Sequence, residues 1–174
     1  KGEEAHLVTP EHMNRLLRVS DIIEALEVIR DTDIGNYLGS FLIKTFDELD
    51  ERLWLYLADS LKFIRWLKPV TSEILRIIDA YVTKYDVLNI KAALQGILTR
   101  KKTQFIPLGI IHDQGLLPEL GNASDVGAII KILDQCGLTD YAALLAGYGV
   151  DAEATVRLLV EAKLDRKYYA NLLK

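Results

Sequence analysis

Hydrophobic residues recur every three or four positions along most of the chain, the spacing that places them on one face of an α-helix. The clearest helix covers residues 49–67 and ends before Pro69, because proline disfavours helical backbone in the preceding residue. Another long helix is predicted to begin at Asp151. The apolar faces are Leu53, Leu57, Leu61, Ile64 and Leu67 in the first helix, and Val156, Leu159, Val160, Leu164, Tyr168 and Leu172 in the last.

Capping residues mark the starts of several further helices. Thr9-Pro10-Glu11 combines an N-cap, a proline at the first helical position and an acid at the positive end of the helix dipole. Asp21 followed by Glu24 resembles a capping box and opens a helix from Ile22 to Ile29. The remaining starts are Thr71-Ser72-Glu73 and Ser124, whose helix reaches Leu133 and stops at Gly137.

Two segments interrupt the helical pattern. "FIPLGII" (105–111) has the composition of a strand, but it is too short and too isolated to build a sheet. Polar residues in "KYDVLNIK" (84–91) leave open whether the helix that starts near residue 71 continues or a new one begins at Asp86. The pattern as a whole predicts an all-α protein.

The chain also contains an internal repeat. "VSDIIEALEVIRDTDIGNYL" (19–38) aligns without a gap on "ASDVGAIIKILDQCGLTDYA" (123–142), and "LDERLWLYL" (49–57) is echoed by "LDRKYYANL" (164–172). Chance similarity between short amphipathic helices is the alternative explanation. Because the two blocks occur in the same order, we predict a duplicated multi-helix domain. Residues 1–104 form the first helical repeat and residues 105–174 a partial second one.

Three motifs carry a family likeness. "KYDVLNIKAAL" (84–94) resembles the K-Y-D-V-x-N-[IL]-K signature of a central-stalk component, which is called C in archaeal and bacterial (A-type or V-type) ATP synthases and d in vacuolar ATPases. "EAKLDRKYYANLL" (161–173) is similar to a second motif of that family, E-x-x-L-D-R-x-Y-Y-x-x-L-L. "PLGIIHDQGLLPEL" (107–120) resembles its short connector, in which a glycine precedes an apolar pair.

The resemblance implies a function without catalysis. Members of the family form a funnel of three similar helical domains between the central shaft and the membrane rotor ring. They couple rotation to ATP hydrolysis or synthesis and to proton or sodium transport. The resemblance implies that the chain corresponds to about half of such a protein, and we expect an engineered piece, a truncated relative or a relative with a changed role. Partners would be shaft and ring subunits, and the location cytoplasmic, peripheral to the membrane through the complex.

Polar residues of the two helical motifs are the first candidates for a site. A buried polar group without a partner costs about 1–3 kcal/mol, so we interpret them as connectors between packed helices, with partner contact as the alternative. Asp165-Arg166 is expected to supply an interhelical ion pair. Catalysis is disfavoured because the first motif offers no histidine for acid–base chemistry. The candidate positions are Tyr85, Asp86, Asn89, Lys91, Leu164, Asp165, Arg166, Tyr168 and Tyr169.

Large aromatic residues of the helix over residues 49–67 form a second candidate. Together with its leucines they make more than half of the helix circumference apolar, which is typical of a helix packed in a core or covered by a partner. Both interpretations stay open. The possible partner surface consists of Trp54, Tyr56, Phe63 and Trp66.

The composition disfavours several classes of function and site. A net charge of −4 disfavours nucleic-acid binding. The three scattered histidines and the single cysteine lack the spacing of metal ligands, and no phosphate-binding loop motif occurs, so we expect no catalytic, cofactor or metal site. No apolar run approaches the ~20 residues of a membrane span.

The run Arg100-Lys101-Lys102 is either solvated or meets an acidic partner or lipid headgroups. A freestanding helical adaptor is the main rival, and an enzyme with an unrecognised site the second.

Overall fold

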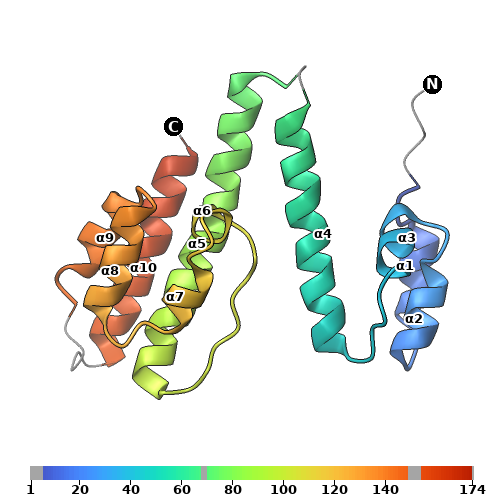
Figure 1. The fold of residues 1–174 in the computed structure, drawn as a ribbon, viewed down its shortest axis with the longest axis horizontal. Coiled ribbons are helices and arrows are strands. Elements are labelled where there is room, and N and C mark those ends of the chain that lie inside the picture. Colours follow the sequence, from blue (N-terminus) through green and yellow to red (C-terminus); the bar gives the residue numbers. More distant parts are fainter. Residues whose placement is uncertain (1–5, 68–69, 149–153, 174) are drawn as a thin grey trace. The chain divides into compact units, whose positions relative to one another are not determined.

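The computed structural model describes residues 6–67, 70–148 and 154–173, and all regular structure in these ranges is helical (Figure 1). The predicted all-α class is confirmed. None of the helices in these ranges is both long and apolar enough to cross a membrane. The helices are α1 (Pro10–Leu16), α2 (Ile22–Val28), α3 (Asp33–Leu38), α4 (Phe46–Trp66), α5 (Ser72–Thr99), α6 (Ile110–Asp113), α7 (Leu117–Gly121), α8 (Val126–Gln135), α9 (Thr139–Leu145) and α10 (Ala154–Leu172).

The start of α1 agrees with the prediction, with Thr9 as N-cap, Pro10 at the first helical position and Glu11 in the first turn, whereas the start of α2 agrees only in part. At α1 the Thr9 hydroxyl accepts from the His12 N–H at 3.3 Å, and the Thr9 N–H donates to His12 Nδ1 at 3.1 Å. Histidine therefore completes this capping box. At α2 Asp21 accepts from the Glu24 N–H at 2.8 Å, but the Glu24 carboxylate accepts from the Ser20 N–H instead of the N–H of Asp21. The box predicted there is wrong in its second half.

The segment around Asp86 belongs to one continuous helix. α5 runs for 28 residues from Ser72 to Thr99, capped at Thr71, so no new helix begins at Asp86. Residues 105–109 of "FIPLGII" form a non-helical connector, and its last two residues, Ile110 and Ile111, begin α6. The predicted cap of α8 is displaced by one residue, since Asp125 accepts from the Ala128 N–H at 2.8 Å. The start predicted at Asp151 lies outside the described residues.

The chain divides into two compact units, Lys1–Phe63 (unit 1) and Ile64–Lys174 (unit 2). This division by contacts differs from the predicted repeat boundary at 104/105, which was defined by sequence similarity, so the repeat stays a prediction. The core of unit 1 is small, comprising Val28, Ile29, Leu38 and Ile43 with half-buried neighbours. The core of unit 2 is larger: α5, α8, α9 and α10 enclose side chains that include Ile90, Ile129, Leu133, Cys136, Leu145 and Leu164.

Only part of the apolar face predicted for the last helix is buried. Val160, Leu164 and Tyr168 lie in the core of unit 2, whereas Leu159 and Leu172 are exposed. The side chain of Val156 lies outside the description. The buried positions of α10 are spaced four residues apart, so a narrow stripe of the helix is enough to pack it against α5 and α9.

Candidate functional site

Asp86 is fully buried at the middle of α5, where its carboxylate holds the start of α6. Oδ2 accepts from the Ile110 N–H at 2.9 Å and Oδ1 from the Ile111 N–H at 3.0 Å. The first N–H groups of a helix have no partner within that helix. Asp86 therefore caps α6 from a different helix, across 24 residues of sequence between Asp86 and Ile110.

Gly109 makes this contact possible. Its φ of +102° is a conformation that other residues rarely adopt, and a Cβ atom at this position would lie 2.3 Å from Asp86 Oδ1. The backbone can approach the carboxylate only because the side chain is missing. The hydrogen bonds of Asp86 on α5 therefore depend on the glycine that precedes α6.

The environment of Asp86 raises its pKa to about 6. Burial is the main cause, and the nearby charge of Asp113 adds to it, while the two hydrogen bonds from Ile111 and Ile110 act in the opposite direction. Both carboxylate oxygens accept backbone hydrogen bonds. This geometry suits holding a connector better than transferring a proton to or from a bound molecule.

Asn89, one helical turn after Asp86, fixes the preceding part of the connector. Its Oδ1 accepts from the Ile106 N–H at 2.8 Å, and its Nδ2 donates to the Ile106 carbonyl at 2.9 Å and to the Leu108 carbonyl at 3.5 Å. The amide thus satisfies backbone groups that no regular element would pair. Asp86 and Asn89 together attach residues 106–111 to α5.

Lys91 joins α5 to α10. Its Nζ lies 2.6 Å from Asp165 Oδ1, and both side chains are partly exposed. The interhelical ion pair expected at Asp165-Arg166 therefore involves Asp165 alone. Arg166 is exposed, and no ion pair between described residues includes it. The structure brings the two motifs together at this point.

The aromatic and leucine positions of the motifs separate into buried and exposed ones. Leu164 is fully buried, and Tyr85 and Tyr168 are nearly so. Tyr169 is exposed, although its ring packs edge-on against Tyr168 at 5.0 Å between centroids. A surface contact with a partner is thus geometrically open to Arg166 and Tyr169, while the buried positions face the core of unit 2.

The aromatic set on α4 divides in the same way. Trp54 and Tyr56 are half-buried: Trp54 Nε1 donates to Asp50 at 3.2 Å, and the Tyr56 ring lies 5.0 Å from that of Tyr37. Phe63 is 58% exposed and Trp66 77% exposed. The first pair contributes to packing, and the second pair is the part of the set that is accessible to a partner.

Sequence reasoning missed Arg65 and Gly109. Arg65 lies near the end of α4 and contacts Asp79 on α5 at 2.6 Å and Asp113 on α6 at 3.0 Å. No spacing signal could have paired residues so far apart in sequence. The glycine was visible in its motif, but its partner is a carboxylate on another helix. Among the described residues, no cluster of three or more His, Cys, Asp or Glu side chains could hold a metal ion.

These contacts define an all-helical protein in which polar side chains of a long helix hold a connector and a second helix. The chain belongs to the ATP synthase (C/AC39) subunit family, whose sequence model matches residues 1–174. It is 26% identical to the C component of the A-type ATP synthase of Methanocaldococcus jannaschii over an alignment of 182 residues. That alignment covers the whole chain but only 44% of the relative. No solved structure matches the chain.

Proposed function

We propose that the chain is a non-catalytic central-stalk adaptor of an A-type or V-type rotary ATPase. In this role it couples the rotor shaft to the membrane ring during proton or sodium transport, on the cytoplasmic side and peripheral to the membrane. The observation that carries the proposal is the family match along the entire chain. We further propose that residues 1–104 and 105–174 are a helical repeat and a partial copy of it.

The geometry of unit 2 supports a mechanical role. Asp86 and Asn89 attach the connector to α5, and Lys91 attaches α10 to the same helix. Close-packed helices deform little under load, and polar contacts at fixed positions resist sliding between them. An adaptor that transmits torque needs both properties, whereas binding of a small substrate needs neither.

A freestanding helical adaptor outside any rotary enzyme is the second candidate. The exposed aromatic residues Phe63 and Trp66 would also suit a different protein partner. The two candidates differ in what the chain binds, because only the first requires shaft or ring subunits.

Affinity purification of the tagged chain from its native cells, after mild solubilisation of membranes, tests the proposal. Mass spectrometry should recover the shaft subunits and ring proteolipids in constant proportion to the bait. Recovery of a stable complex that lacks every rotary subunit would overturn the proposal and favour the freestanding adaptor.

Two surface variants sharpen this test. Trp66→Ser should reduce recovery of the rotary subunits about tenfold, because exposed aromatic residues are common anchors of interfaces. Leu42→Ser removes another exposed apolar side chain and should leave recovery unchanged. Thermal unfolding of each purified variant shows whether it keeps the native fold. Equal losses in both variants would exclude Trp66 as a specific contact.

A further inference from the structure

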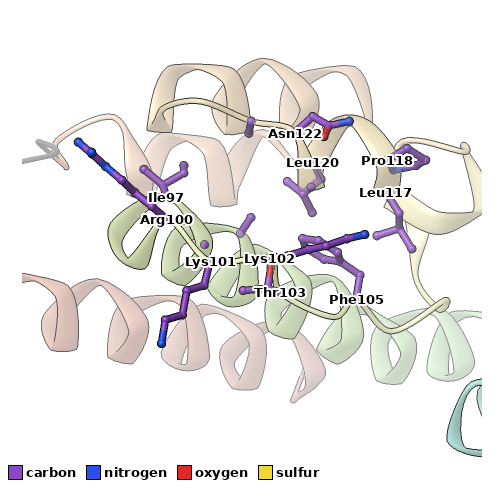
Figure 2. Close-up of a pocket in the computed structure, with 14 residues that line it drawn as sticks. Ile97, Arg100, Lys101, Lys102, Thr103, Phe105, Leu117, Pro118, Leu120 and Asn122 are labelled. Atoms are coloured by element: carbon purple, nitrogen blue, oxygen red, sulfur yellow. The ribbon is translucent and has the colours of Figure 1, made fainter. Parts of the chain in front are cut away.

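A pocket with a volume of about 690 Å³ lies where α5 ends and α7 passes beside it (Figure 2). Its apolar lining comes from both helices and from the segment between them. Ligand pockets in proteins have volumes of roughly 300–1,000 Å³, so the space can hold a large side chain with part of its backbone. The apolar contributors are Ala93, Ile97, Phe105, Leu117, Pro118, Leu120 and Ala123.

Three consecutive cations line this apolar pocket at the end of α5. Arg100, Lys101 and Lys102 all line it and are all exposed. Figure 2 shows Arg100 and Lys101 pointing in different directions at one end of the pocket, whereas Lys102 extends along it toward Phe105. None of the described residues that line the pocket is acidic. The negative end of the α5 dipole also lies here, but it offsets only part of this charge.

The turn that places the cations is conformationally unusual. Arg100 has a φ of +54°, and no other non-glycine residue in the described part of the chain has a positive φ. A glycine or asparagine normally takes the left-handed position after a helix, since it carries less steric cost there. The chain keeps a long cationic side chain instead, at the edge of the pocket.

We propose that this pocket binds an acidic segment of a partner protein. An apolar side chain of the segment fills the space between α5 and α7, and flanking carboxylates pair with Arg100, Lys101 and Lys102. The positive charge of the pocket requires a negatively charged ligand, and its apolar lining requires that the ligand also carry a hydrophobic group. The inference goes beyond the stalk proposal, because it concerns the chemistry of the bound segment rather than the machine to which the partner belongs.

The shape of the site favours a peptide over a membrane surface. A flat layer of lipid headgroups would meet the three cations, but it would leave the apolar lining of the concave pocket without contacts. A peptide presents carboxylates and a protruding side chain together. Charged groups at the edge of such a site raise the association rate and specify the partner, while the buried side chain supplies most of the affinity.

The probe is a fluorescein-labelled peptide with one phenylalanine flanked on both sides by glutamates, and the readout is fluorescence anisotropy on the full chain. We expect saturable binding that weakens as salt rises, because the charges at the edge are exposed. The double variant Lys101→Glu/Lys102→Glu should weaken binding about tenfold or more, and Leu117→Ser about fivefold.

Matched controls separate this site from general attraction. The variant Lys131→Glu/Lys163→Glu makes the same charge change at exposed positions outside the pocket and should alter binding less than about twofold. A peptide with lysines in place of the glutamates should not bind. Circular dichroism of every variant confirms the native helical content before binding is measured.

Three results would overturn the proposal. The first is equal weakening by the two double variants. The second is tight binding to phosphatidylserine vesicles that is lost in Lys101→Glu/Lys102→Glu, when the peptide does not bind at all; this would assign the cations to a membrane. The third is binding of dodecanoate, a free anionic amphiphile, under conditions in which the peptide fails. Each can occur whether or not the chain is a stalk component, so this test is independent of the purification described above.

Discussion

The pair α2–α3 in unit 1 and the pair α8–α9 in unit 2 begin alike and then diverge. Asp21 and Asp125 cap their helices with the same hydrogen bond, each 2.8 Å long, to the backbone N–H three residues later. Tyr37 and Tyr141, which the sequence alignment pairs, both lie on the second helix of their pair, Tyr37 near the end of α3 and Tyr141 near the start of α9. The pairs differ in how that second helix starts.

Unit 1 uses a side chain for this start. The Thr32 hydroxyl donates to the Ile29 carbonyl at 2.6 Å and accepts from the Gly35 N–H at 3.0 Å. At the equivalent place in unit 2, Cys136 lies in the core, and no side chain caps α9. Gly137 takes a φ of +74° instead, and the Leu138 N–H donates to the Leu133 carbonyl at 2.8 Å.

The size of the two cores explains the difference. Unit 1 buries few apolar side chains completely, so a hydrogen-bonded threonine adds order that packing alone does not supply. Unit 2 packs α8 and α9 against α5 and α10, so a small apolar residue at the turn is more useful than a polar one. The same sequence pattern is therefore stabilised by polar contacts in one unit and by burial in the other.

Replacing a tightly packed glycine in each unit should give the largest effects. In Gly35→Ala the new Cβ would lie 1.8 Å from the Ile29 carbonyl oxygen, and in Gly109→Ala 2.3 Å from Asp86 Oδ1. Each change should lower the free energy of unfolding of its own unit by about 3 kcal/mol or more. Hydrogen exchange resolved by unit measures this. Gly147→Ala, where a Cβ meets nothing within 4 Å, is the control. Unchanged protection of α6 in Gly109→Ala would contradict the role assigned to Asp86.

Truncation of equivalent core residues tests the difference in core size directly. Leu133 is 0% exposed and Ile29 is 8% exposed. Leu133→Ala should cost about 3–4 kcal/mol and Ile29→Ala about 2 kcal/mol, because a densely packed site relaxes less around a cavity. Chemical denaturation monitored by hydrogen exchange gives the loss of unfolding free energy for each unit separately. A larger cost for Ile29→Ala would refute the comparison.

Stability of unit 2 should carry a pH dependence that arises from Asp86. Burial raises the pKa of this carboxyl in the folded chain to about 6, so the folded state holds the proton more tightly than the unfolded state. The contribution of Asp86 to stability is greatest below pH ~4 and declines by about 3 kcal/mol as pH rises through 6. Because other carboxyls titrate in the same range, the quantity to measure is the difference in unfolding free energy between the wild-type chain and Asp86→Asn.

That difference should decrease between pH 4 and pH 7, since asparagine does not titrate. A difference that is constant with pH would show that Asp86 keeps an ordinary pKa. Hydrogen exchange of the Ile110 and Ile111 amides provides a second readout, because both donate to this side chain.

Removal of the two matching helix caps should give the smallest effects. Asp21→Ala and Asp125→Ala should each cost about 1 kcal/mol, because each removes one hydrogen bond to a helix N-terminus. Equal costs would support the proposed duplication of the α2 and α8 starts. A cost at only one of them would show that the cap matters in that unit alone.

The helices were predictable from sequence where periodicity and caps agree. Pro10 marked α1, Asp21 marked α2, and the leucines before Pro69 marked α4. The continuity of α5 through Asp86 and Asn89 was not predictable, because polar residues inside a helix look like a break until their partners are known. α6 and α7 were not predicted, since their few residues carry no periodic signal.

The candidate site was predictable as a set of residues but not as a set of contacts. Asp86 and Asn89 bind backbone groups of residues 106–111. Because almost every residue carries the same backbone groups, the sequence does not show which of them a side chain will bind. A role as connectors between packed helices could be expected for these residues, but their partners could not: Asp165, which pairs with Lys91, lies 74 residues away. The exposure of Phe63 and Trp66 depends on neighbours that helical spacing does not reveal.

The thiol of Cys136 can be used to measure the opening of unit 2. It is the single cysteine in the sequence, it lies in the core of unit 2, and burial raises the pKa of its thiol. A thiol reagent in solution therefore reacts only when unit 2 opens. The rate of labelling therefore measures how often unit 2 opens, without any substitution in the chain.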